Sequence, residues 1–251
     1  MKATFKIWRT HQGTTDGTFQ TFHTEVSEGM VVLDAVHRIQ AEEAPDLAVR
    51  WNCKAGKCGS CSAEINGKPR LMCMTRLSQV NLDEPVTVEP MRAFPPIKDL
   101  VTDVSWNFRV KKSIRKFKVK PKEADGTWRV KQRDIDRVQE FRKCIECFLC
   151  QDVCHVLRDH AKFDDFIGPR FLIYAAQLEM NPIDSDDRVP DLKDKHNIGY
   201  CNITKCCTKV CPEHIHITDN GIIPMKERMA DNVDPIVWLL RKFRGGRKEP
   251  A

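Results

Sequence analysis

Twelve cysteines, gathered in three closely spaced groups, constrain this 251-residue chain more than any other feature. The chain opens with MKATFKIWRT, which has neither an apolar signal core nor an Arg- and Ser-rich transit segment, so we expect a cytoplasmic protein. Cytoplasmic thiols are kept reduced, and clustered cysteines there bind metals more often than they form disulfides. We therefore interpret the three groups as ligands of metal centres.

The first group has the spacing C-x4-C-x2-C, followed by a further cysteine after eleven residues. This is the plant-type spacing for a [2Fe–2S] cluster. Gly56 and Gly59 leave room for the loop to wrap closely, and Asn66-Gly67 predicts a hairpin that brings in the last ligand. A four-thiolate zinc site is the alternative, but it would use paired C-x2-C motifs. The predicted [2Fe–2S] ligands are Cys53, Cys58, Cys61 and Cys73.

The second and third groups follow one pattern, C-x2-C-x2-C-x3-C, which is the spacing of two-cluster bacterial ferredoxins. In such pairs the fourth cysteine of each run binds the cluster of the other run. The second run occupies positions 201, 204, 207 and 211, but position 204 holds Thr204. Crossing the fourth ligands predicts a [4Fe–4S] site of Cys144, Cys147, Cys150 and Cys211, and a three-thiolate site of Cys154, Cys201 and Cys207.

The missing thiolate at Thr204 predicts the type of the last cluster. Three thiolates suit three irons, so we expect [3Fe–4S]; the alternative is [4Fe–4S] completed by solvent or by the Thr204 oxygen. Cys206 lies one residue out of register and is expected to be a small buried side chain. Its exchange with Cys207 as the ligand stays open, although Cys207 keeps the x3 spacing to Cys211.

The two halves of the chain differ in hydrophobic periodicity, which predicts an α+β fold. The first half alternates as strands do and contains one helical repeat, whereas strand patterns disappear after Phe94-Pro95-Pro96. We expect a domain of residues 1–105 and a helical domain of residues 106–251. Strands are expected at 5–7, 19–26, 60–65, 68–74 and 86–88, and helices at 32–39, 134–143, 170–180, 225–231 and 234–243. Asp134 is expected to cap one helix and Pro169 to begin another.

The charge distribution marks one further segment. The net charge is +6, yet residues 109–122 contain no acidic residue. Such a stripe can bind nucleic acid, anionic lipid headgroups or an acidic protein, or it can be a solvated linker; we favour lipid or an acidic partner. The apolar run 235–240 is far shorter than the ~18 residues of a membrane helix. The basic residues are Arg109, Lys111, Lys112, Arg115, Lys116, Lys118, Lys120 and Lys122.

A plant-type loop followed by two crossed bacterial-type runs resembles the iron–sulfur subunit of succinate dehydrogenase and fumarate reductase. The resemblance extends to residues 51–61, 96–101, 166–169 and 184–188. It implies a β-grasp plant-type ferredoxin domain, then an all-helical bacterial-ferredoxin-like domain. It also implies an FAD-containing flavoprotein subunit, transmembrane anchor subunits and a quinone. Electrons would pass between flavin and quinone through the clusters, with succinate oxidation favoured, at the cytoplasmic face of the inner or plasma membrane. It implies no catalytic residue and no nucleic-acid partner here.

The sequence departs from this family near the expected quinone. Many members have proline after the ligand equivalent to Cys154 and a tryptophan pair soon after, whereas this chain has His155 and no tryptophan in residues 156–160. His155 is therefore a candidate quinone contact, unless it only hydrogen-bonds a backbone carbonyl. Two alternatives remain: a subunit of another quinone- or disulfide-linked oxidoreductase, and a zinc-dependent nucleic-acid-binding protein.

Overall fold

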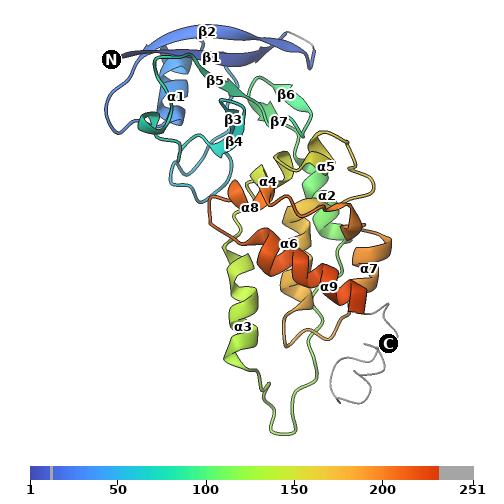
Figure 1. The fold of residues 1–251 in the computed structure, drawn as a ribbon. Coiled ribbons are helices and arrows are strands. Elements are labelled where there is room, and N and C mark those ends of the chain that lie inside the picture. The colour runs from blue at the N-terminus through green and yellow to red at the C-terminus, as the bar shows by residue number, and fades with distance from the viewer. Residues whose placement is uncertain (12–13, 232–251) are drawn as a thin grey trace.

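The structure is a computed structural model that describes residues 1–11 and 14–231. Figure 1 shows a sheet at one end of the molecule and a group of helices at the other. The short helices that carry the two cysteine runs, α4 (Leu149–Asp152) and α8 (Cys206–Lys209), lie where these two parts meet.

The main sheet has five strands in the order β2-β1-β5-β3-β4. β1 and β5 are parallel, and the other neighbouring pairs are antiparallel. Alternate residues of β1, among them Phe5 and Ile7, are fully buried, as half-buried strands require. The expected strands and the first helix are all present, namely β1 (Lys2–Thr10), β2 (Gly17–Glu25), α1 (Val32–Glu42), β3 (Ser62–Ile65), β4 (Lys68–Leu71) and β5 (Val86–Glu89).

The predicted hairpin at Asn66-Gly67 is confirmed. Both residues have positive φ, 49° and 68°, which is the backbone of a type I′ turn between β3 and β4. β4 ends at Leu71, so the hairpin holds Cys73 against the loop that carries the other cysteines of the first group.

A second, two-stranded sheet follows the main one, formed by β6 (Pro96–Lys98) and β7 (Val101–Thr102). The expectation that strands end at Phe94-Pro95-Pro96 is therefore wrong, because strands of three and two residues are too short to show an alternating pattern. Between these strands, buried Asp99 accepts hydrogen bonds from the amides of Thr10 at 2.9 Å and Ala48 at 2.8 Å, and from Arg9 at 3.2 Å. A buried carboxylate needs several donors, and this set fastens the second sheet to β1.

The remaining described elements are helical, with two differences from expectation. The helix expected to start at Asp134 starts at Gln132, because Lys131 already has the extended backbone of an N-cap; Asp134 sits in the first turn. Residues 140–143 form a separate 3₁₀ turn. Pro169 does lie in the first turn of its helix. The elements are η1 (Leu77–Gln79, before β5), α2 (Ser105–Ser113), α3 (Gln132–Gln139), η2 (Glu140–Lys143), α4, α5 (His155–Arg158), α6 (Gly168–Glu179), α7 (Val189–Asp194), η3 (Ile198–Tyr200), α8, η4 (Ile217–Ile222) and α9 (Ile223–Asp231).

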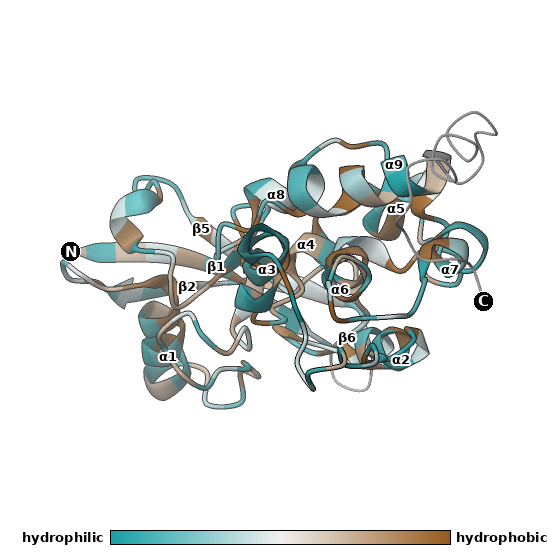
Figure 2. Ribbon diagram, turned by 90° about the horizontal axis from the view of Figure 1, so that it is seen from below, coloured by the Kyte–Doolittle hydropathy of each residue, from teal (hydrophilic) through white to brown (hydrophobic). Residues whose placement is uncertain are grey.

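Helix α6 forms the centre of the helical part. Nine of its residues are buried, whereas α3 buries only Val138. Figure 2 shows this contrast, with α3 largely hydrophilic and hydrophobic segments gathered around α6. The expected helix 234–243 and the apolar run 235–240 lie outside the described residues. Within residues 1–11 and 14–231, no helix is both long and apolar enough to span a bilayer.

A cluster of buried charges joins the main sheet to the helices. Glu64 on β3, fully buried, pairs with Arg158 of α5 at 3.0 Å and with Arg92 at 3.4 Å. Asp152 of α4 is equally buried, contacts Glu64 and accepts the Ala93 amide at 3.0 Å. Burial raises the pKa of both carboxyl groups, that of Asp152 to about 7. Two neighbouring carboxyl groups with raised pKa values therefore lie at the junction of the two parts.

Candidate iron–sulfur cluster sites

Three cysteines of the first group, Cys53, Cys58 and Cys61, lie in the loop between α1 and β3, and the fourth, Cys73, follows β4. Gly56 and Gly59 adopt positive φ of 67° and 70°, so the loop turns its amides inward at these points. The amides of Ala55 and Lys57 donate to Sγ of Cys53 at 3.3 and 3.4 Å. These amide donors lower the pKa of Cys53 to about 6, and amide donors are what an anionic cluster requires.

The four cysteines of this group form two contacting pairs, and Cys61 of the second pair is close enough to Cys58 of the first for their charges to interact. The side chain of Cys58 hydrogen-bonds Cys53, and that of Cys61 hydrogen-bonds Cys73. The amide of Cys73 also donates to Sγ of Cys61 at 3.5 Å, while burial raises the pKa of Cys61 to about 12. The structure thus brings together all four predicted [2Fe–2S] ligands.

This loop packs directly on the first run, which we define as residues 144–154. A Cβ atom on Gly59 would lie 2.6 Å from Cα of Cys147, so only glycine fits there. Ser62 reinforces the contact: its buried hydroxyl lies 2.8 Å from the Cys147 carbonyl and 2.9 Å from the Gly59 carbonyl. No side chain separates the first two cysteine groups at this point.

The first run and one cysteine of the second run, residues 201–211, line a common cavity of about 350 Å³. Arg170, 6% exposed at its side chain, also lines it and pairs with Glu146 at 2.7 Å. Burial raises the pKa of Cys147 to about 12 and raises that of Cys150 well above its usual value. The cysteines of this cavity are Cys144, Cys147, Cys150 and Cys211, the four predicted [4Fe–4S] ligands.

The backbones of the two runs follow the same path. Glu146 and Phe148 of the first run have φ of 56° and 61°, and Ile203 and Lys205, at the matching positions of the second, have 63° and 61°. Each run is preceded by a 3₁₀ turn and continues as a one-turn helix, α4 or α8. Four non-glycine residues in the left-handed region indicate a backbone held in shape by its surroundings, and the repeat read from the cysteine spacing is confirmed.

The second cavity, of about 320 Å³, lies between the second run and α5. Cys207 hydrogen-bonds Thr218 at 3.5 Å and lies close enough to Cys150 for their charges to interact. Burial raises the pKa of Cys154 to about 11. This cavity is lined by the three predicted ligands Cys154, Cys201 and Cys207, and also by Thr204, Cys206 and His155.

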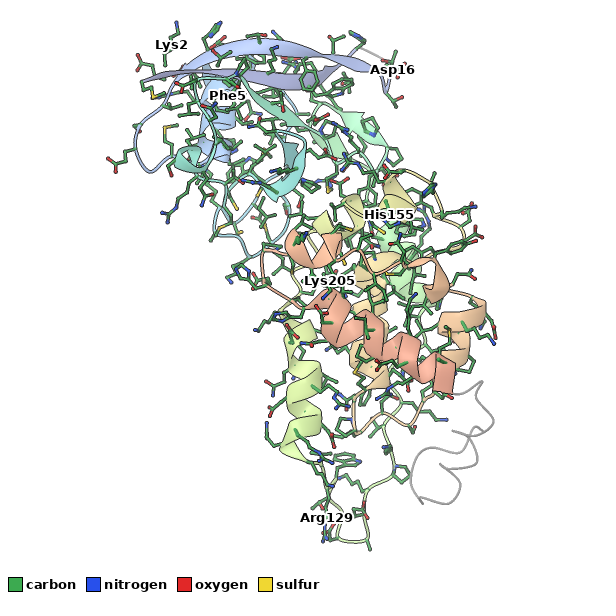
Figure 3. All side chains as sticks on the ribbon, viewed as in Figure 1. Lys2, Phe5, Asp16, Arg129, His155 and Lys205 are labelled. Carbon is green, nitrogen blue, oxygen red and sulfur yellow. The ribbon has the colours of Figure 1, made fainter. Side chains whose placement is uncertain are left out.

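Cys206 differs from its sequence expectation, because its side chain is partly exposed rather than buried. Its sulfur lies 3.3 Å from Oγ1 of Thr204 and hydrogen-bonds the His155 ring. The Cys207 thiol donates to the Cys206 sulfur, which lowers the pKa of Cys206 and raises that of Cys207, and burial raises the latter further. Figure 3 places His155 and Lys205 near the middle of the molecule, where the runs lie.

The donors of these sites are those that iron–sulfur clusters use. Within the part of the chain that the structure describes, no three His, Cys, Asp or Glu side chains converge as one metal ion would require. The thiols instead surround cavities, as ligands of a multi-iron cluster must. Backbone amides also point at them, for example that of Ile215 at Sγ of Cys211, 3.4 Å away. The residues present therefore fit iron–sulfur clusters.

The basic segment 109–122 is partly neutralised within the chain. Arg115 pairs with Asp191 at 2.6 Å and Asp186 at 3.0 Å, and Lys111 pairs with Glu146 beside the first cavity. Lys112, Lys116, Lys118 and Lys122 are exposed. The expectation of a lipid or acidic-protein partner therefore concerns mainly these exposed lysines, and it stays a prediction.

Two residues that the cysteine spacing does not reveal also contribute to the sites. Ser62 bridges the first loop and the first run, and Arg170 brings a buried positive charge to the first cavity. Neither residue type carries a spacing signal, because the contacts depend on how the two parts pack. Arg170 could have been suspected from its position just after Pro169, in the first turn of a helix otherwise rich in apolar residues.

The comparisons with known proteins agree with this arrangement. Residues 4–109 match the family described as 2Fe-2S iron-sulfur cluster binding domain, and residues 140–215 match the 4Fe-4S dicluster domain. The chain is 33% identical to a fumarate reductase iron–sulfur subunit of Mycobacterium tuberculosis, over 79% of this chain and 81% of that protein. It is 29% identical to a succinate dehydrogenase iron–sulfur subunit of Coxiella burnetii, over 85% and 91%.

A solved structure extends the similarity to the fold. One chain of the Mycobacterium smegmatis Sdh1 complex in the apo form superposes with a TM-score of 0.89 at 57% sequence identity. The match covers 94% of this chain and 98% of that one. The order of the two cluster-binding parts and their fold are therefore shared over nearly the whole length.

Proposed function

Because this chain belongs to the family of iron–sulfur subunits of succinate dehydrogenase and fumarate reductase, we propose that it relays electrons between FAD and a quinone. The FAD belongs to a flavoprotein subunit, and transmembrane anchor subunits hold the complex at the cytoplasmic face of the membrane. Succinate oxidation is the favoured direction. The dicarboxylate chemistry takes place on the flavoprotein subunit, so this chain contributes electron transfer.

One observation carries the proposal: the three cysteine groups form an unbroken series of contacts. The loop of the first group touches the first run through Gly59 and Ser62 at Cys147. On the far side of the first cavity, α4, which carries Cys150, packs against α8, which carries Cys207. Electrons can thus pass from the first group to the last without crossing solvent.

The cluster types follow from the cysteines that line each site. Four thiols stand around each of the first two sites, in agreement with [2Fe–2S] and [4Fe–4S], and the second cavity has three thiols in register, in agreement with [3Fe–4S]. Bound clusters supply one-electron chemistry. The chain adds amide donors at Cys53 and Cys211 and the Arg170 charge, which stabilise negative charge and tune the potentials.

The fold proposed for this function has two ferredoxin-like domains. Residues 1–105 are a β-grasp plant-type domain, supported by the mixed sheet with α1 packed on it and by the family match at 4–109. From residue 106 onward the chain is a bacterial-ferredoxin-like helical domain, supported by the repeated backbone of the two runs and the match at 140–215.

His155 is the proposed quinone contact. It lines the second cavity beside the last cysteine group, and its ring already hydrogen-bonds a polar atom of that site, the Cys206 sulfur. In the purified complex, H155A should slow quinone reduction while leaving electron transfer from succinate to the clusters intact. Unchanged quinone kinetics in H155A would remove His155 from the proposal.

Low-temperature EPR during a redox titration of the purified complex tests the whole proposal. It should resolve three clusters of different type. Succinate should reduce the three-iron cluster when the flavoprotein subunit is present. A colourless preparation containing zinc, or co-purification without a flavoprotein that is active with succinate, would contradict it. The second result would favour another oxidoreductase built on the same modules.

A further inference from the structure

The repeat between the two runs shows that Cys206 occupies an unusual place. Its counterpart in the first run is Leu149, which is 1% exposed and packs in the core. Cys206 has the same backbone position on α8, yet its side chain is partly exposed and its sulfur turns toward Thr204. The second run has therefore exchanged an apolar core contact for a thiol at the cavity.

Thr204 of the second run occupies the position that corresponds to Cys147, a predicted cluster ligand, in the first run. The Cys206 sulfur lies 3.3 Å from the Thr204 hydroxyl, so it stands next to the place that a fourth thiolate would occupy. It lines the same cavity as the three predicted ligands and hydrogen-bonds one of them, Cys207. Four thiols are thus present at a site whose register provides three.

We propose that Cys206 is a conditional fourth ligand, which lets the three-iron site take up one Fe²⁺ and become a [4Fe–4S] site. The inference rests on the proposed function, because it needs a three-iron cluster at Cys154, Cys201 and Cys207. Cys206 binds the added iron, and the site returns to three irons when that iron is lost.

The reaction balances without a further oxidant. One electron, which the preceding clusters deliver under the proposed function, first reduces the oxidised [3Fe–4S]⁺ core to [3Fe–4S]⁰. This core then combines with Fe²⁺ to give [4Fe–4S]²⁺, so no other electron moves. A bond forms between the added iron and the Cys206 sulfur, and the thiol proton passes to solvent. Thiolate is the soft ligand that iron in such clusters prefers.

The surroundings of the second run allow iron to enter. Residues 202–205 are exposed, whereas at the matching positions of the first run residues 145 and 146 are half-buried and residues 147 and 148 are buried. Fe²⁺ can therefore reach the second run from solvent, whereas the first cavity already has four thiols in register and offers no free position for an added iron. The proposal accordingly predicts that iron uptake is confined to one cluster.

The experiment uses the purified complex treated with ⁵⁷Fe²⁺ and dithionite under anaerobic conditions, followed by Mössbauer and EPR spectroscopy. In the unaltered protein, the three-iron EPR signal found after reoxidation should fall several-fold. One ⁵⁷Fe per chain should appear in a four-iron environment. C206S should keep its three-iron signal before treatment and show no uptake. T204V, which removes only the neighbouring hydroxyl, should take up iron as the unaltered protein does.

Equal uptake by C206S and the unaltered protein would overturn the inference, as would no uptake by either. Loss of the three-iron signal from untreated C206S would also overturn it, because Cys206 would then be a permanent ligand in place of Cys207. A three-iron signal absent from the untreated, unaltered complex would instead contradict the proposed function, and the inference would fall with it.

Discussion

The two cysteine runs share a backbone but differ in their surroundings. Both contain two left-handed residues at matching positions, and both continue as a one-turn helix. The first run is buried from residue 147 to residue 152, between the sheet and the helices, whereas residues 202–205 of the second run are exposed. The repeat preserves the loop, and the packing around each copy has diverged.

This difference shows that the loop conformation of a run does not depend on how many cysteine ligands the run contains. The φ angles on either side of Thr204 match those on either side of Cys147, so threonine is tolerated without distortion. The side chain at position 204 therefore decides how many in-register thiols the second run supplies. The stability of the first run, in contrast, depends on the many contacts that tie it to the N-terminal sheet.

The largest effect on stability is expected from removing the ion pair that anchors the first run. R158A leaves Glu64, which has no exposed side-chain surface, without its closest charged partner. Removing one member of a buried ion pair costs about 3–5 kcal/mol. Arg92 still pairs with Glu64 at 3.4 Å, so the lower end of this range is expected. The free energy of unfolding, measured with denaturant, tests this.

R133A is the matched control for that change. Its guanidinium group is exposed and pairs with Asp134 at 3.7 Å. Exposed pairs of this kind contribute at most ~1 kcal/mol. Equal destabilisation by R158A and R133A would contradict the anchoring of the first run by buried charge.

The next largest effect is expected at Gly59, where the first loop meets the first run. G59A places a Cβ atom 2.6 Å from Cα of Cys147 on a residue with φ of 70°. Backbone strain and overpacking each cost about 1–3 kcal/mol. We expect a loss of stability of at least ~2 kcal/mol and slower electron transfer between the first two clusters, measured by freeze-quench EPR.

G29A separates the two causes, because Gly29 has φ of 85° and no atom within 4 Å of the added Cβ. The free energy of unfolding of G29A should fall by only about 1 kcal/mol, which is the cost of placing a side chain in the left-handed region. If G29A and G59A are destabilised equally, the close approach to Cys147 contributes nothing.

A smaller effect on stability, but a complete change of cluster type, is expected from making the two runs alike. T204C restores the fourth in-register thiol on a backbone that already matches the first run. The free energy of unfolding should change by less than ~1 kcal/mol. The three-iron EPR signal should disappear, and one additional iron per chain should be bound as the protein is isolated. Persistence of the three-iron signal in T204C would show that ligand count does not decide the cluster type.

The smallest effect on stability is expected from the exposed part of the basic segment. K112E/K116E reverses two charges that are exposed, and surface changes of this kind alter stability by about 0.5 kcal/mol or less. Association with anionic vesicles or with the rest of the complex should weaken several-fold, as followed by co-sedimentation at two salt concentrations. K193E, at another exposed lysine on α7, is the control, and equal binding by both variants would identify the segment as a linker.

The sequence predicts the ligand groups well because cluster geometry imposes fixed spacings on cysteines. The same reason explains why the hairpin at Asn66-Gly67 and the helix at Pro169 were predictable, since each depends on local backbone preferences. Ser62 and the contact of Asp152 with Glu64 were not predictable, because they form only when the sheet and the helices pack together. The burial of Cys206 was wrongly predicted, since hydrophobicity alone does not reveal which neighbour a thiol faces.

The central claim is that three clusters of different iron content occupy one chain in a fixed order. Iron determined per chain in the complex as isolated, with Mössbauer spectroscopy to type the clusters and iron of any haem in the anchor subtracted, tests it most directly. The account predicts nine irons, from clusters of two, four and three. Ten irons in the complex as isolated, with two [4Fe–4S] clusters and no three-iron component, would contradict it.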